Sequence, residues 1–369
     1  MLRDVLETAG LNVRAADDVR WDFAALGEVM LRFDPGEFRI AQARTFRVWE
    51  GGGEYNVARG MRSCFRLRST ILTAQVSNPV GRLVEDLMLQ GGVDTSHVLW
   101  RADDGIGQEC RNGMYFLERG FGVRGALGSM DRGHTAVSQL KPGDINWDDL
   151  FGREGVRWFH TGGIFCALGE HTSAVALEAL QSARKHGTTI SYDCNYRPSL
   201  WRSRGGRLAA TATNRQLAPF VDVLFGHEGD LATELSTVTN GPPDHTPESY
   251  AAMAARLTEA YPNLRMVATP TRKAHAANRN DWGAYAFADG QLHIAREMRD
   301  LDIYDRVGGG DSFAAGLIAA VLNGQGVDYA LRCGLAHGAL TMTTAGDSSF
   351  VTEGEVQRLM DGLDAGVQR

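Results

Sequence analysis

The sequence predicts an α/β fold with a mainly parallel sheet, and three observations support this. In the middle of the chain, residues 155–161 read as a strand, 171–186 as a helix and 188–193 as the next strand. Such alternation is typical of βαβ units. The 369 residues include 44 glycines, which suit numerous tight strand–helix turns. Two glycine runs, Gly51–Gly53 and Gly308–Gly310, each lead into a helical pattern.

Composition excludes several classes of function. A net charge of −7 argues against nucleic acid or an anionic membrane surface as a partner. The five cysteines are far apart and show no metal-binding spacing, so we expect reduced thiols and a cytoplasmic protein. No apolar run approaches the ~18 residues of a membrane span, and the N-terminus lacks a signal-peptide core.

The N-terminal part begins with residues 1–22, which are polar and mixed in charge. We expect them to form an extension, with Leu2, Val5 and Leu6 on one face of a short helix. Residues 23–33 then predict a buried first strand, interrupted by Gly27 and Glu28. Arg32 is a charge inside this apolar run. It either reaches water at the strand end or faces a carboxylated substrate.

The first glycine run opens the backbone at a helix start, and Asn56 follows one turn later. An amide side chain can both donate to and accept from sugar hydroxyls. The alternative is a simple turn with a helix cap. Strands at 44–49 and 69–76 and a helix at 79–90 flank this region.

Residues 104–135 lack helix signals, contain a short strand at 114–117 and are rich in glycine. A glycine-rich insertion beside an α/β body suggests a lid. Its candidate ligand residues, each of which could instead be a solvated loop residue, are Tyr115, Arg124, Arg132 and His134.

A cluster of polar residues follows the strand that ends near Asp193, and it includes Asn195 and Arg197. Ligands of parallel sheets lie at the carboxyl ends of strands. The planar fork of Arg197 suits a carboxylate or phosphate, whereas the alternative is a structural ion pair with Asp193. A helix is also expected at 144–150, before this cluster, and a strand at 264–269, after it.

The second glycine run ends in Asp311, and a helix is expected to start near that residue. Free N–H groups and the helix dipole make such a start an anion site. An aspartate there would repel a resting phosphate, but it could take a proton from a hydroxyl that attacks phosphorus. The alternative is that Asp311 only caps the helix.

Together these segments resemble the ribokinase-like (PfkB) sugar kinases. Gly308–Asp311 resembles the Gly-Ala-Gly-Asp signature of that family, with Gly309 in the alanine place. Residues 51–58 are similar to its sugar-binding Gly-Gly-x-x-x-Asn-x-Ala element. Residues 193–201 resemble the Asp-x-Asn-Tyr-Arg-x-x-Leu-Trp segment of 2-keto-3-deoxygluconate kinases. The usual Asn-x-x-Glu motif is altered here to His227 and Asp230.

This resemblance implies a ribokinase-like three-layer sandwich with a mainly parallel central sheet and a small β lid. The kinase domain would span 23–365, with lid segments near 34–50 and 104–135. ATP and Mg²⁺ are implied, with Asp230 near the metal through water, as is a homo-oligomer. Asp311 would be the base and Gly308–Gly310 the anion hole. The other implied contacts are Gly51, Gly52, Asn56, Tyr115, Arg132, Arg197 and Arg32 for the sugar, and Asn195, Thr271, Arg272 and His337 for the nucleotide.

The sequence therefore predicts an ATP-dependent kinase that phosphorylates the primary hydroxyl of 2-keto-3-deoxygluconate. Two alternatives stay open at this point. One is a kinase of the same fold that acts on a neutral sugar such as fructose or ribose. The other is a catalytically silent relative that binds a sugar or nucleotide, which the altered segments at 227–230 and 269–273 would fit.

Overall fold

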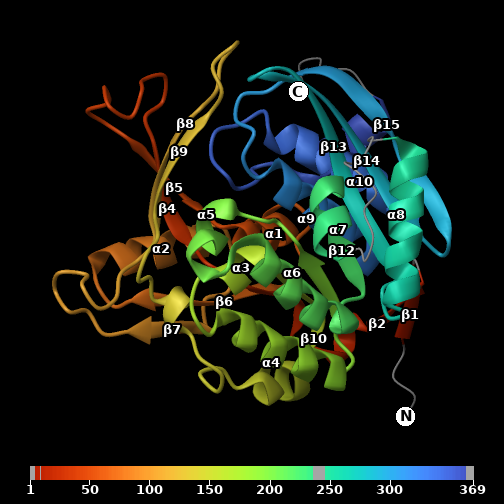
Figure 1. Ribbon diagram of the computed structural model, residues 1–369, viewed down its shortest axis with the longest axis horizontal. Coiled ribbons are helices and arrows are strands. Elements are labelled where there is room, and N and C mark those ends of the chain that lie inside the picture. Colours follow the sequence, from red (N-terminus) through yellow and green to blue (C-terminus); the bar gives the residue numbers. More distant parts are fainter. Residues whose placement is uncertain (1–4, 9, 236–245, 363–369) are drawn as a thin grey trace.

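A large sheet forms the centre of the protein. The computed structural model describes residues 5–8, 10–235 and 246–362 (Figure 1). In spatial order the nine strands are β15 (Gln291–Asp302), β14 (Arg279–Ala288), β13 (Met266–Ala276), β12 (Val223–Phe225), β11 (Thr189–Asp193), β10 (Val156–Gly162), β3 (Trp21–Leu26), β6 (Ser69–Val76) and β7 (Val98–Arg101). The strands from β13 to β7 run parallel, and β13, β14 and β15 pair antiparallel. The predicted mainly parallel sheet is confirmed.

Helices pack on both faces of this sheet and make three layers (Figure 1). One face is covered by α1 (Gly53–Ser63), α2 (Pro79–Gln90), α9 (Gly309–Leu322), α10 (Val327–Thr341) and α11 (Glu353–Met360). The other face is covered by α3 (Gly163–Ala167), α4 (Thr172–Lys185), α5 (Pro198–Trp201), α6 (Gly206–Leu217), α7 (Glu228–Glu234) and α8 (Pro247–Ala260).

The side-chain alternation of β3 shows how the two faces are separated. Phe23 and Ala25 belong to the apolar core under α1 and α9, whereas Ala24 and Leu26 belong to the core under α4. Successive residues of a strand point to opposite faces, so the apolar run Phe23–Leu26 serves both cores. The predicted three-layer α/β architecture is confirmed.

A second, smaller sheet of four strands lies beside the main body. It corresponds to the small β lid that the sequence predicted. Its strands are β5 (Arg47–Gly51), β4 (Met30–Asp34), β8 (Met114–Glu118) and β9 (Leu127–Asp131). The prediction of a single strand over 23–33, interrupted by Gly27 and Glu28, is wrong, because β3 and β4 belong to different sheets. The chain breaks at Gly27, where a Cβ atom would lie 2.4 Å from a carboxylate oxygen of Glu54.

The N-terminal residues form a hairpin of β1 (Val5–Thr8) and β2 (Leu11–Arg14). The short helix expected around residues 2–6 is therefore wrong where it is described, and Leu2 lies outside the described residues. Leu11 and Val13 are buried in the core. The Nε of Arg157 donates to the carbonyl of Arg14 over 2.8 Å, which ties the hairpin to β10.

Two further expectations shift along the chain. A helix was predicted at 144–150, but the structure has a π-helix at Asp149–Gly155 instead. The strand predicted at 264–269 continues through Pro270 to Ala276. Pro270 is tolerated because β12 pairs with β13 only as far as Ala268, which leaves one side of β13 without a partner strand. Among the described residues no helix is long and apolar enough to cross a membrane.

Candidate active site

The start of α9 is built from glycine because another segment crosses it closely. Gly308 has a φ of +80°, and a Cβ atom there would lie 1.8 Å from the carbonyl oxygen of Asp347. Gly309 and Gly310 open the helix, and no side chain caps it. A helix start with unused N–H groups attracts anions. Asp311 lies within the first turn, so the alternative role as N-cap does not apply.

Asp311 and Asn56 meet although 255 residues separate them. The Asn56 amide donates a hydrogen bond of 2.7 Å to Oδ2 of Asp311. The other oxygen, Oδ1, lies 3.8 Å from where a Cβ atom of Gly53 would be. The start of α1 and the start of α9 therefore face each other, with one carboxylate between them.

The environment of this carboxylate raises its pKa to about 7. Burial is the largest cause, because it disfavours the charged form. The hydrogen bond from Asn56 opposes the shift, whereas the charges of Asp193 and Asp347 add to it. A pKa near neutrality suits a group that must accept a proton at physiological pH.

The start of α1 is also glycine because of a close crossing. A Cβ atom at Gly52 would lie 1.9 Å from the carbonyl oxygen of Glu28. At Gly51 it would lie 2.6 Å from Oδ2 of Asp347 and 2.8 Å from the Tyr115 hydroxyl. Both helix starts thus need glycine for the same reason, and both leave the backbone open.

A third polar group lies at the carboxyl end of β11. Asn195 has a φ of +34°, and its N–H donates to Oδ1 of Asp193 over 3.2 Å. A Cβ atom at Gly53 would lie 4.0 Å from Nδ2 of Asn195, so this strand end borders the two helix starts. Burial raises the pKa of both Asp193 and Asp230, while the charges of His227 and Arg197 lower both.

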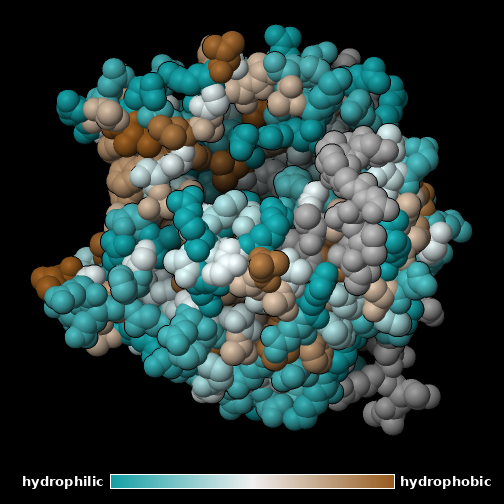
Figure 2. All heavy atoms as spheres, viewed as in Figure 1, coloured by the Kyte–Doolittle hydropathy of each residue, from teal (hydrophilic) through white to brown (hydrophobic). Residues whose placement is uncertain are grey.

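The space-filling view shows a hollow on this face, between the four-stranded sheet with the ends of β13–β15 and the helical body below (Figure 2). Apolar side chains at the tip of the four-stranded sheet are exposed, among them Phe121, Leu127 and Met130. A hollow between a small sheet and an α/β body is where a small ligand could be enclosed.

Comparisons with known proteins agree with this geometry. Residues 22–353 match the model of the pfkB family of carbohydrate kinases. The chain belongs to this family. It is 31% identical over 349 residues to a 2-dehydro-3-deoxygalactonokinase of Haloferax volcanii, covering 94% of this chain and 99% of the relative. It is also 28% identical over 337 residues to a 2-dehydro-3-deoxygluconokinase of Bacillus subtilis, covering 89% and 92%.

The solved structures give the same answer. A 2-dehydro-3-deoxygluconokinase from Thermotoga maritima superimposes with a TM-score of 0.84 at 32% identity, covering 92% of this chain and 99% of the other. The protein is therefore a ribokinase-like sugar kinase, a phosphotransferase with an alcohol group as acceptor. Kinases of the pfkB family use ATP with Mg²⁺.

In this pfkB-family kinase, two of the predicted arginines differ in how their guanidinium groups are paired. Arg197 is exposed, and its guanidinium donates a hydrogen bond of 3.3 Å to the neighbouring carbonyl of Tyr196. Its charge nevertheless reaches Asp311 and lowers the pKa of that group. Arg132 pairs with Glu28 at the end of the small sheet. Of the two, Arg197 has the freer guanidinium. Arg124 and His134 lie elsewhere in the insertion, and Arg124 shares an isolated backbone bridge with Phe121.

Two predicted contacts do not fit the structure. Arg32 is fully buried and paired with two carboxylates, so it cannot also face a substrate carboxylate. His337 is fully buried behind α9, with Nδ1 donating to the Ser312 carbonyl and Nε2 accepting from the Ser349 hydroxyl, both over 2.8 Å. It has no surface to offer to an adenine ring. Burial lowers its pKa to about 4, so the ring is neutral.

The predicted nucleotide residues Thr271 and Arg272 lie on β13, whose end extends past β12. Burial lowers the pKa of Arg272, and the nearby positive charge of Arg306 lowers it further. Arg306 precedes Gly308 by two residues and was missed from sequence. Two arginines that repel each other beside an anion site could both bind phosphate oxygens.

Two further acids near the site were also missed. Asp347 accepts the Tyr115 hydroxyl and packs on Gly51 and Gly308. Glu54, in the first turn of α1, is buried, and its pKa rises to about 8, chiefly by burial and in part through Asp311. Its place directly after the first glycine run was the one signal that could have found it.

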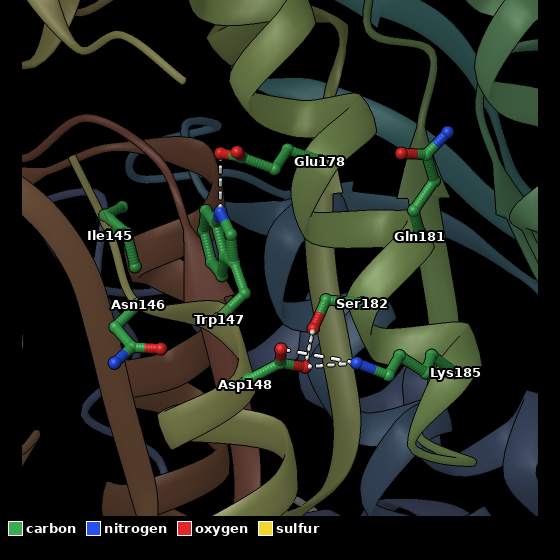
Figure 3. Close-up of a pocket in the computed structure, with 8 residues that line it drawn as sticks. All are labelled: Ile145, Asn146, Trp147, Asp148, Glu178, Gln181, Ser182 and Lys185. Carbon is green, nitrogen blue, oxygen red and sulfur yellow. Dashed lines mark hydrogen bonds and ion pairs between the residues drawn. The ribbon is translucent and has the colours of Figure 1, made fainter. Parts of the chain in front are cut away.

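A separate surface pocket of about 380 Å³ lies between residues 145–148 and α4 (Figure 3). None of the predicted site residues lines it. Polar groups that line it are hydrogen-bonded to one another: Trp147 donates to Glu178 over 2.9 Å, and Lys185 donates to Asp148 over 3.0 Å. With its polar groups used in this way, the pocket has no part in the chemistry considered below.

Proposed function

We propose that this kinase transfers the γ-phosphoryl group of ATP to the primary hydroxyl of a 2-keto-3-deoxy sugar acid, with 2-keto-3-deoxygluconate as the first candidate. The hydrogen bond between Asn56 and Asp311 carries the proposal, because it puts a base of pKa about 7 beside the Gly51–Asn56 turn, which is predicted to bind the sugar. The names of the relatives from Haloferax, Bacillus and Thermotoga support a sugar acid as substrate.

The reaction needs one proton transfer and one displacement at phosphorus. The hydroxyl oxygen of the sugar forms a bond to the γ-phosphorus, the bond from that phosphorus to the β–γ bridging oxygen breaks, and ADP leaves. The hydroxyl proton passes to Asp311, whose Oδ1 is the oxygen not held by Asn56. If the transition state is loose, the proton leaves late, and positioning and charge stabilisation supply most of the rate.

The start of α9 would stabilise the moving phosphoryl group. The N–H groups of Gly309 and Gly310 carry no side-chain cap, and the positive end of a 14-residue helix lies behind them. Arg306 and Arg272 would neutralise the remaining phosphates of ATP. Asp193 and Asp230 fit a divalent cation held largely through water, because burial raises the pKa of both carboxyls and the charge of Asp230 raises that of Asp193 further. Mg²⁺ would neutralise charge on the phosphate oxygens there.

The sugar would lie between the two helix starts. Gly51, Gly52 and Asn56 would hold its hydroxylated tail, and Tyr115 borders the same turn. Arg197, supported by Arg132, would face the carboxylate, because a guanidinium fork binds a carboxylate through two hydrogen bonds. The small sheet would cover the site and exclude water, which could otherwise hydrolyse ATP.

A substrate panel tests this proposal. ADP release is measured with 2-keto-3-deoxygluconate, 2-keto-3-deoxygalactonate, fructose and ribose, with wild type and Arg197→Ala compared. We expect both sugar acids to be phosphorylated much faster than the neutral sugars. Arg197→Ala should raise KM for the acids by roughly 10- to 100-fold, the worth of a charged hydrogen-bonded pair, and leave fructose unchanged.

Each other outcome has a definite meaning. Faster turnover of fructose or ribose than of the two sugar acids would show that this is a neutral-sugar kinase. Absent ADP release indicates a silent relative that binds without turnover, and sugar-independent ADP release indicates ATP hydrolysis by water without transfer to a sugar. Equal losses on acids and neutral sugars in Arg197→Ala would remove the carboxylate role of Arg197.

A further inference from the structure

Arg32 lies on β4 of the small sheet and is fully buried. Its Nη1 donates to Oδ1 of Asp347 over 2.6 Å, and its Nη2 pairs closely with Asp305. The three residues come from segments that are distant in sequence. A buried guanidinium is costly unless its charge is matched. Here one cation is shared by two close acids, Asp305 and Asp347, while a third buried acid, Asp34, lies 4.0 Å from Nη2.

Both acids border the start of α9. Asp305 precedes Gly308 by three residues, and its Oδ1 accepts from the N–H of Val307 over 3.4 Å. Its other oxygen accepts from the N–H of Gly346 over 3.4 Å. The carbonyl of the next residue, Asp347, presses directly on Gly308. One guanidinium therefore holds together the two backbone segments that shape the anion site.

The same cluster borders the Gly51–Asn56 turn. The carboxylate of Asp347 accepts the hydroxyl of Tyr115 on β8 and packs on Gly51 at the end of β5. Strands β4, β5 and β8 all belong to the small sheet. Arg32 and Asp347 thus form the junction between that sheet and the start of the catalytic helix.

We propose that Arg32 is a positioning residue that couples the small sheet to the anion site at the start of α9, through Asp305 and Asp347, without touching either substrate. This inference rests on the proposed role of the α9 start in phosphoryl transfer. Without the guanidinium fork, two buried acids lose their shared partner and the 305–308 loop loses its anchor. A lysine restores the charge, but its single ammonium cannot bridge two carboxylates as a planar fork does.

The kinetic test compares Arg32→Lys and Arg32→Met with the matched pair Arg157→Lys and Arg157→Met. Arg157 is also buried, but it bonds Asp22 and the carbonyl of Leu322, at the opposite end of α9. We expect Arg32→Lys to lose about 100-fold in kcat, since small misplacements of catalytic groups cost this much. KM for ATP and for the sugar should stay within about threefold. The Arg157 variants should lose thermal stability but keep kcat.

A second measurement does not need turnover and remains available if Arg32→Met fails to fold. Amide hydrogen exchange of residues 305–310 should be faster in Arg32→Lys than in wild type and unchanged in Arg157→Lys. The assay uses whichever sugar of the panel wild type phosphorylates, so a wrong sugar leaves this comparison intact. Unchanged exchange, wild-type kcat in Arg32→Lys, or an equal kcat loss in Arg157→Lys would overturn the proposal. A rise in sugar-acid KM with normal kcat would instead return Arg32 to a substrate contact.

Discussion

The starts of α1 and α9 use the same backbone device with different chemistry. Each is opened by glycine because a carbonyl from a distant segment crosses within 2 Å of where a Cβ would be: that of Glu28 at Gly52, and that of Asp347 at Gly308. Neither helix has a side-chain cap. One turn in, α1 carries the neutral Asn56 and α9 carries the acidic Asp311. The backbone thus provides two similar open helix starts, and one side chain on each decides whether it suits hydroxyl groups or proton transfer.

The largest expected effect comes from making the two helix starts chemically alike. Asp311→Asn removes the base but keeps its shape, and turnover should fall by on the order of 10²–10⁴. ATP binding, measured by calorimetry, should persist or strengthen, because a negative charge has left the anion site. Near-normal turnover in this variant would show that Asp311 is not the base.

An intermediate effect is expected at the other helix. Asn56→Ala removes the hydrogen bond that lowers the pKa of Asp311, so that pKa should rise above its value of about 7. The base works as a carboxylate, so activity falls as pH drops through this pKa, and the acid limb of kcat/KM should move to higher pH. Sugar KM should rise by about tenfold as well.

Ser348→Ala is the matched control for Asn56→Ala. The Ser348 hydroxyl lies 3.5 Å from the oxygen of Asn56, so its loss leaves the amide donor in place. Its acid limb should coincide with that of wild type. A limb that stays in place in Asn56→Ala would show that the hydrogen bond does not tune Asp311.

The smallest expected effect separates the ligands of the two helices. A methyl group at Gly310 meets nothing within 4 Å, and one at Gly53 would make only ordinary contacts with Asp311 and Asn195. Both proteins should fold normally. Gly53→Ala should weaken sugar binding, and Gly310→Ala should weaken ATP binding, each by roughly tenfold or less, since the added group enters ligand space. If each raised the KM of the other substrate instead, the assignment of the two helix starts would be reversed.

The parts of the site that were predictable are those with local signals. Asp311 and Asn56 each follow a glycine run at a helix start, and the strand end at Asp193 is marked by polar residues without periodicity. The alternation of strands and helices likewise predicted the sheet. Each of these inferences needs only a few neighbouring residues.

The parts that were missed depend on contacts between distant segments. The two acids that Arg32 hydrogen-bonds lie 273 and 315 residues away, so a buried ion cluster looked like a candidate substrate contact. His337 was expected beside the nucleotide from the family resemblance alone, but packing places it in the core. The break between β3 and β4 was visible at Gly27, yet nothing local showed that the two halves join different sheets.

The N-terminal hairpin limits how far the chain can be shortened. The family match begins at residue 22, yet Leu11 and Val13 are only 2% and 0% exposed, and their neighbours would face water without them. Homology boundaries therefore understate the unit that folds. A version trimmed to the matched region should aggregate or melt early, even though every proposed catalytic group would still be present.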